Sequence, residues 1–236
     1  MYPVLLKTPY FTIYSYGFCM ALAVLLAWFI SSKLSQHFSN RQTGSPYSAS
    51  TATDLLFVFF ASGIAGARLF YVLQHPGEYA GRWQAVLFLQ EGGLVWYGGF
   101  LGGVACGLLY MKQRRIPILV WADLFAPVLA LSHAVGRVGC YLNGCCYGRD
   151  GYPVQIYEAV LLCTISALLF VRLFRQKKEG EIFALYLIAY GLLRFGLEFF
   201  RGDQTAYAGL TLPQWISLCV FIFGVRLYGN IRRPHR

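Results

Sequence analysis

The sequence predicts an all-α protein that crosses a membrane several times, and three observations lead to this fold class. Of its 236 residues, 57% are hydrophobic and only 13% are charged, which is too apolar for a soluble single domain. Uncharged runs of about 20 residues, the length that crosses a bilayer as a helix, recur along the chain. The basic residues are concentrated in alternate connections between the apolar runs. We therefore expect seven transmembrane helices in one domain over residues 1–236, because helices satisfy their own backbone in lipid.

Three of the expected helices lack charged residues over their whole length. They cover residues 8–32, 92–111 and 204–225. Four more are apolar but carry ionisable groups, at about residues 51–73, 116–136, 154–174 and 182–200. No basic region with a cleavage site precedes the first run, so we interpret it as a retained anchor rather than a signal peptide.

The distribution of basic residues predicts the orientation of the chain. They follow the first, third, fifth and seventh runs: Lys33 and Arg41; Lys112, Arg114 and Arg115; Arg172, Arg175, Lys177 and Lys178; Arg226, Arg232, Arg233 and Arg236. The positive-inside rule assigns these segments to the cytoplasm, with the N-terminus outside and the C-terminus inside. The net charge of +10 is thereby explained without nucleic-acid binding.

The connections have distinct characters. Residues 1–12 contain prolines and aromatic residues that suit an arm on the outer surface, and residues 36–50 form a polar connector. Residues 74–91 carry Tyr79 and Trp83 in an amphipathic pattern that indicates an interfacial segment. The glycines of residues 92–103 allow either a neighbouring helix or a lipid to approach the backbone closely.

With this orientation, the polar residues of the spans converge on the outer leaflet. They are Tyr16, Arg68, Tyr97, His133, Arg137, Gln155, Tyr157, Glu158, Arg194, Glu198 and Arg201, whereas Asp123 falls on the inner side. Ionisable groups at membrane depth are costly and mark function or a paired network. A cluster of arginines suits an anionic phosphate, which guanidinium binds bidentately. A local pair between Arg194 and Glu198 is the structural alternative, but it does not explain the other charges at this depth.

Several motifs in order resemble the bacterial phosphatidylglycerol prolipoprotein diacylglyceryl transferases. They are G-A-R-L-F-Y-V-L, G-G-L-V-W-Y-G-G-F-L-G, D-L-F-A-P-V-L-A-L, G-R-V-G-C-Y-L-N-G, P-V-Q-I-Y-E and Y-G-L-L-R-F-G-L-E-F-F-R. The resemblance implies a seven-helix enzyme of the bacterial cytoplasmic membrane whose active site faces the outer leaflet. Such enzymes modify lipoproteins: they transfer a diacylglyceryl group from phosphatidylglycerol to a prolipoprotein cysteine and release glycerol phosphate. The implied partners are this or a similar anionic phospholipid and a protein acceptor with a cysteine.

The family's functional residues carry over only in part. Arg137 and Arg194 match its essential arginines, and the further matches are Asn143, Tyr190, Glu198 and Arg201. The chain departs from the family at Tyr97 and Tyr152, where a histidine is usual, at Cys140, where an asparagine is usual, and at Cys145, where a glutamate is usual. Residues 149–152 stand where the family has a longer outer insert. These departures bear on the acceptor and on the proton chemistry.

The family reaction needs a base for the acceptor thiol. Tyr97 serves if nearby cations lower its pKa from about 10, and His133 is the alternative base. Arg137 and Arg194 are expected to stabilise the phosphate that leaves.

The cysteines of residues 140–146 leave two hypotheses open. A disulfide from Cys140 to Cys145 or Cys146 suits an oxidising outer face, and a nucleophile that takes up the lipid group itself is the alternative. The spacing C-x-x-x-x-C-C is no standard metal motif, so neither a metal nor another cofactor is expected.

Other functions remain open. A transporter would need polar groups on both sides of the membrane midplane, but the inner half of these spans offers only Asp123. A related transfer to a different acceptor fits the departures in the motifs. A non-catalytic phospholipid-binding protein would keep the arginines and lose the base, and activity on labelled phosphatidylglycerol distinguishes it from an enzyme.

Overall fold

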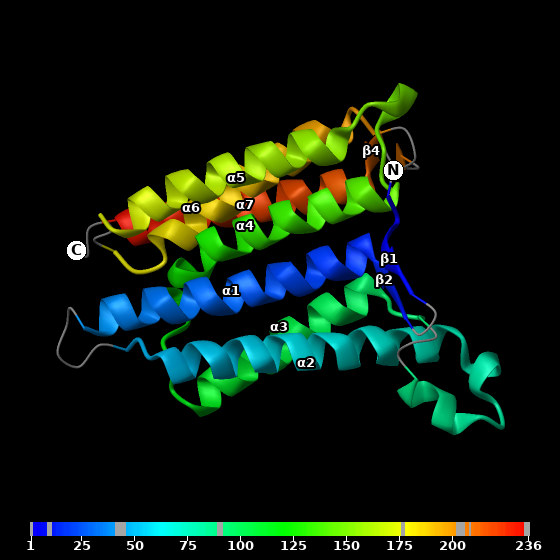
Figure 1. Ribbon diagram of the computed structural model, residues 1–236. Coiled ribbons are helices and arrows are strands. Elements are labelled where there is room, and N and C mark those ends of the chain that lie inside the picture. The colour runs from blue at the N-terminus through cyan, green and yellow to red at the C-terminus, as the bar shows by residue number, and fades with distance from the viewer. Residues whose placement is uncertain are drawn as a thin grey trace. The chain divides into compact units, whose positions relative to one another are not determined.

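The computed structural model describes residues 2–8, 11–40, 46–88, 92–175, 178–201, 206–207 and 209–233. These residues form seven α-helices, which confirms the helical class: α1 (Ser15–Ser39), α2 (Ala49–Gln74), α3 (Trp96–Gln113), α4 (Ile118–Asn143), α5 (Val154–Leu173), α6 (Glu181–Glu198) and α7 (Leu212–Arg232) (Figure 1). Short 3-10 helices are η1 (Pro76–Tyr79), η2 (Trp83–Leu87) and η4 (Arg149–Gly151). Two small hairpins, β1 (Val4–Lys7) with β2 (Thr12–Tyr14) and β3 (Ala206–Tyr207) with β4 (Leu210–Thr211), were not predicted.

Five of the helices, α1, α2, α4, α5 and α7, are long and apolar enough to cross a membrane. The other two, α3 and α6, have 18 residues each, which corresponds to about 27 Å of helix. Large apolar side chains point outward from the helices: Phe57 is 71% exposed and Leu168 is 66% exposed. Such surfaces are stable where lipid rather than water covers them. A multi-pass membrane protein is confirmed, and the count of seven spans stays a prediction.

Two predicted helix starts were wrong. The first helix begins at Ser15 rather than at residue 8, because β1 and β2 pair antiparallel with Val4 opposite Tyr14. The last begins at Leu212 rather than at residue 204, since Thr211 and Gln214 form a capping box there. Both segments are apolar and rich in aromatic or β-branched residues, a composition that fits a strand as well as a helix.

The chain divides into two compact units. Unit 1 comprises Met1–Leu34 and Leu119–Arg236, and unit 2 comprises Ser35–Ile118. The single domain expected over residues 1–236 therefore stays a prediction.

In unit 2, glycines let α2 and α3 pack backbone against backbone (Figure 1). A Cβ on Gly66 would lie 2.5 Å from the carbonyl oxygen of Gly98 and 3.0 Å from the Cα of Gly102. No larger residue fits at Gly66 without moving a helix. Of the two alternatives for the glycine-rich stretch, the structure supports close helix packing.

In unit 1, α4, α5, α6 and α7 run side by side, and their ends form two distinct faces (Figure 1). At one face the N-terminal segment meets the end of α4, where Tyr2 N donates to Leu142 O at 3.1 Å, and the end of α6 meets the turn before α5, where Arg149 N donates to Phe200 O at 2.8 Å. We name this face the site end. The last turn of α7 lies at the opposite end, where Lys178 Nζ donates to Ile231 O at 2.9 Å.

The buried Asp123 lies at that opposite end and has a structural role, because it links α4 to the start of α6. Its carboxylate accepts hydrogen bonds from Gly180 N at 2.6 Å and Phe183 N at 2.8 Å. It therefore supplies an anion to the N-terminus of α6, where backbone N–H groups lack helical partners. Glu181 adds an ion pair to Arg172 at 2.6 Å and one to Arg232 at 3.0 Å.

Candidate active site

The site end of unit 1 contains a cluster of buried ionisable side chains centred on Glu158. This residue of α5 is 1% exposed. Its Oε2 lies 3.0 Å from Arg137 Nε and its Oε1 lies 3.8 Å from His133 Nε2, both on α4. His133, Arg137 and Cys140 follow one another at spacings of four and three residues on α4, which places them on one helix face. Two of the residues predicted as catalytic therefore share one carboxylate.

A second pair lies on α6. Arg194 Nη2 is 2.9 Å from Glu198 Oε2, and both residues are buried. Thr211 Oγ1 donates to Glu198 Oε1 at 3.0 Å. The local pairing expected at i and i+4 is thus present. It uses one amino group of Arg194, while Nη1 is buried and has no hydrogen-bond partner among the described residues.

Aromatic rings connect the two pairs. The ring of His133 is 5.5 Å from that of Tyr190, which stacks at 5.8 Å on Tyr186. Arg137 lies within electrostatic reach of Tyr190 and Arg201. Arg137 of α4, Arg194 of α6 and Arg201, three residues after α6, therefore lie at one end of the unit; their roles stay a prediction.

Three cysteines lie beside the arginines. The Sγ atoms of Cys140, Cys145 and Cys146 are all within 4.8 Å of one another, and each residue has a free thiol. The predicted disulfide is not present in this structure, and it stays a prediction. Residues 141–143, expected as a turn, form the last turn of α4.

The electrostatics of Cys146 disfavour a role as a nucleophile. Burial raises the pKa of its thiol above the ordinary value, and so does the hydrogen bond with Cys145. The charges of Arg201 and Arg137 lower this pKa to a smaller extent. The thiol is accordingly protonated near neutral pH, whereas thiolate is the reactive form.

Other predicted residues of unit 1 surround this cluster. Gln155 is 1% exposed; its Nε2 donates to Cys145 O at 2.6 Å, and its Oε1 is buried without a partner among the described residues. Tyr16 lies within electrostatic reach of Arg137 and of the three thiols. Asn143 and Tyr157 are exposed at the end of α4 and the start of α5.

The structure gives Arg68, predicted as a substrate-binding residue, a structural role in unit 2. Its guanidinium donates to the carbonyl oxygens of Ala85, Val86, Phe88, Gly92 and Gly93 at 2.6–3.2 Å. It also lies 5.3 Å from the ring centre of Tyr79. All three nitrogens hold the loop after α2, and the lipid contact of Arg68 stays a prediction.

Tyr97 is the other predicted site residue of unit 2. It is the second residue of α3, 47% exposed, and its ring meets that of Trp96 edge-on at 5.4 Å. Its role stays a prediction.

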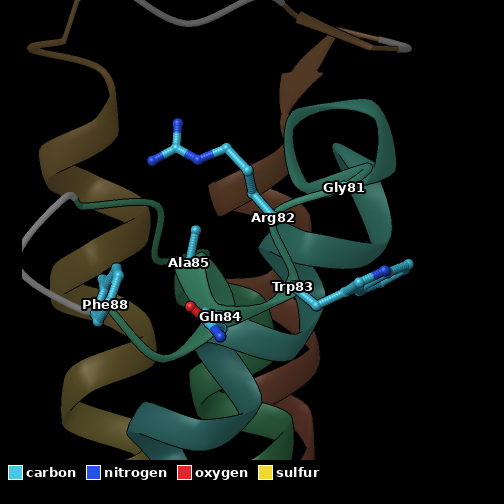
Figure 2. A pocket seen from close by; sticks show the side chains of 6 residues that line it. All are labelled: Gly81, Arg82, Trp83, Gln84, Ala85 and Phe88. Carbon is cyan, nitrogen blue, oxygen red and sulfur yellow. The ribbon is translucent and has the colours of Figure 1, made fainter.

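Unit 2 also has an open hollow (Figure 2). It is lined by Gly81, Arg82, Trp83, Gln84, Ala85 and Phe88. Arg82 and Trp83 extend away from the loop in different directions, so they do not converge on a common point. None of the predicted site residues lines it, and we do not assign the chemistry to this hollow.

Sequence reasoning missed Thr211. It caps α7 and also donates to Glu198. The pattern T-x-x-Q before an apolar run is a sequence indication of such a cap, but the helix was expected to start earlier.

These features define a multi-pass membrane protein with a buried arginine–carboxylate cluster at one end of its helices. The model of the prolipoprotein diacylglyceryl transferase family matches residues 3–229, and the chain belongs to this family. It is 30% identical to the phosphatidylglycerol–prolipoprotein diacylglyceryl transferase of Clostridium tetani, over 99% of this chain and 98% of the relative. It is also 30% identical to the enzyme of that name from Verminephrobacter eiseniae, over 98% and 94% of the two chains. The family predicted from the motifs is confirmed.

Proposed function

We propose that this protein transfers a diacylglyceryl group from phosphatidylglycerol to a cysteine thiol of a prolipoprotein. The observation that carries the proposal is the pair of arginines, Arg137 and Arg194, each balanced by a buried carboxylate in apolar helices. Buried ion pairs are costly to keep where packing alone would suffice. The names of the relatives supply the donor and the acceptor.

The ion pairs leave donors for a phosphate. Glu158 pairs with Nε of Arg137, and Glu198 pairs with Nη2 of Arg194. The buried Nη1 of Arg194 has no partner among the residues that the structure describes. A phosphate oxygen satisfies such a donor with a charge-assisted hydrogen bond. The proposed contacts of Asn143, Gln155, Tyr157, Tyr190, Arg201 and Tyr16 are with the remainder of the two substrates.

At carbon, the transfer forms one bond and breaks one. The acceptor sulfur attacks the glycerol carbon of the diacylglyceryl group, the carbon–oxygen bond to phosphate breaks, and glycerol phosphate leaves with the electron pair. Arg137 and Arg194 stabilise the charge that grows on the leaving phosphate in a low dielectric. The thiol proton goes to a base, for which His133 is our candidate, because Glu158 Oε1 lies 3.8 Å from its Nε2 and orients the imidazole ring.

We propose that the site end faces the outer leaflet of the bacterial cytoplasmic membrane. The opposite end of unit 1 carries Arg172, Arg175, Lys178, Arg226, Arg232 and Arg233, as the positive-inside rule requires of a cytoplasmic face. The N-terminus is then outside and the C-terminus inside. This assignment treats α3 and α6 as the remaining spans and both units as one transmembrane domain.

A transfer assay tests the function. The full-length protein is placed in vesicles of phosphatidylglycerol labelled in its acyl chains and given a prolipoprotein peptide with a lipobox cysteine. We expect labelled peptide and glycerol phosphate in equal amounts. The matched peptide with Cys→Ser should remain unlabelled, as should the cysteine peptide in vesicles of phosphatidylcholine. Saturable binding of phosphatidylglycerol without any transfer would instead assign a non-catalytic lipid-binding protein.

A further inference from the structure

We propose that Cys140, Cys145 and Cys146 bind one copper(I) ion through their three sulfur atoms. This metal site is a property of the thiols and does not depend on the proposed transferase reaction. Their spacing along the chain matches no standard metal motif, but the fold brings them together.

The distances suit a three-coordinate ion. A metal–sulfur bond of about 2.3 Å places three sulfurs of a trigonal plane about 4 Å apart. The Sγ atoms of the three cysteines already lie within 4.8 Å of one another. Small side-chain rotations close the difference. A disulfide uses two thiols and leaves the third without a purpose, whereas three mutually close sulfurs are what a trigonal ion requires.

The backbone holds the thiols in this arrangement. Gly144 has a φ of +80°, and Cys145 N donates to Cys140 O at 3.1 Å, which is the hydrogen bond of a Schellman cap. Cys146 has a φ of +65°, a conformation that non-glycine residues seldom adopt. Gln155 fixes the turn from α5 through its bond to Cys145 O. Such local strain persists where the surroundings enforce it, and it is concentrated at functional sites.

Nearby arginines balance the charge of the proposed metal site. Three thiolates and one monovalent cation carry two negative charges in excess. Arg137 and Arg201 both lie within electrostatic reach of Cys146 and offset these charges. On binding, three S–H bonds break, three protons leave to solvent and three metal–sulfur bonds form, with no change in oxidation state.

Copper(I) fits this donor set better than zinc does. Thiolates select soft ions such as copper(I) and zinc, and structural zinc takes four ligands. In the described parts of the chain, the group of candidate ligands consists of these three cysteines alone.

Copper titration of the reduced full-length protein in detergent micelles tests the site. Copper(I) is supplied as its bicinchoninate complex, and X-ray absorption reports the ligands. We expect one copper per chain with three sulfur neighbours. Each single variant, Cys140→Ser, Cys145→Ser or Cys146→Ser, should weaken binding at least about tenfold, and the triple variant should abolish it. Cys106→Ser and Cys163→Ser, at exposed positions of α3 and α5, are the matched controls and should bind as wild type.

A readout without substitutions covers the case in which a variant fails to fold. Bound copper should protect three thiols of the wild-type protein from alkylation. The proposal is overturned if all three thiols are counted as reduced and no copper binds. It is equally overturned if copper binds the folded triple variant. The same holds if excess copper(I) fails to displace zinc from protein that has first been loaded with one zinc per chain. A stoichiometric disulfide from Cys140 to Cys145 or Cys146, in protein isolated with its thiols blocked at lysis, would assign a structural bridge in place of the metal.

Discussion

Oε2 of Glu158 lies 3.0 Å from Nε of Arg137, in a pair whose side chains are 2% and 15% exposed. The carboxylate thus lies against the Nε side of the guanidinium. The other carboxylate oxygen lies 3.8 Å from His133. One buried anion therefore orients both the arginine proposed to bind phosphate and the histidine proposed as the base.

The first prediction concerns the two arginines. Arg137→Lys and Arg194→Lys keep the positive charge but lose the planar fork that binds phosphate bidentately. We expect each variant to lower the transfer rate by about 100-fold or more, the range found when one donor to a developing anion is removed. The rate is measured with labelled phosphatidylglycerol at saturating acceptor peptide.

Each arginine variant must also be shown to fold. Thermal unfolding in detergent should remain cooperative, because lysine still pairs with the neighbouring carboxylate. Arg175→Lys, an exposed position beyond α5, makes the same change elsewhere and should transfer lipid at the wild-type rate. Wild-type turnover by Arg137→Lys or Arg194→Lys would remove that residue from the mechanism.

The second prediction separates the structural from the catalytic role of Glu158. Glu158→Gln keeps the shape and leaves the charge of Arg137 unpaired, which should destabilise the protein by about 3–5 kcal/mol. Adding Arg137→Met removes the unpaired charge and should recover most of the stability, as a double-mutant cycle reports. Activity should not recover. If the double variant is as unstable as Glu158→Gln alone, then the two residues are not coupled.

The sequence predicted the helices better than the hairpins. The spans of residues 51–73 and 154–174 correspond to α2 (Ala49–Gln74) and α5 (Val154–Leu173), because long, mostly apolar runs leave few alternatives in lipid. At residues 4–14 the side chains are equally apolar. There the pairing of β1 with β2 depends on partners several residues away, which helical periodicity does not reveal.

The position of polar residues along the helices was predictable from the sequence, but their contacts were not. Counting residues from the helix ends brings Arg137, Glu158 and Arg194 to one end of unit 1, where the structure has them. The same counting included Arg68, whose guanidinium is occupied by backbone carbonyls of its own loop. Depth along a helix does not tell which way a side chain turns.

The third prediction follows from Arg68. A lysine offers one point of donation in place of a guanidinium that reaches five carbonyl groups. Arg68→Lys should therefore lower the free energy of unfolding by about 1–3 kcal/mol. Transfer per folded molecule and the KM for phosphatidylglycerol should stay within about twofold of wild type, because the substitution changes the stability of the loop and not a substrate contact. A large rise in that KM at unchanged stability would restore the lipid contact.

The fourth prediction concerns Asp123, which lies at the end away from the proposed chemistry. Asp123→Asn keeps one acceptor oxygen and loses the charge that faces Gly180 N and Phe183 N. Losing a hydrogen bond to a charged group costs about 1.5–3 kcal/mol, so the melting temperature should fall. The matched control is Asp54→Asn, an exposed carboxylate on α2 that accepts from Tyr110 Oη at 3.4 Å, and it should change stability by less than about 0.5 kcal/mol. Loss of transfer by folded Asp123→Asn would assign this residue a functional role that its contacts do not provide.

The last prediction tests Tyr97, which occupies a position where members of the family usually have histidine. Tyr97→Phe removes the hydroxyl and leaves the ring that packs edge-on against Trp96, so stability should not change. If Tyr97 rather than His133 is the base, the variant should lose about 100-fold in turnover, within the range for general-base catalysis. The matched control is Tyr110→Phe, which makes the same change at the other end of α3 and should remain active. Normal turnover by Tyr97→Phe, combined with a large loss in His133→Gln, would assign the base to His133 alone and leave Tyr97 a packing residue at the start of its helix.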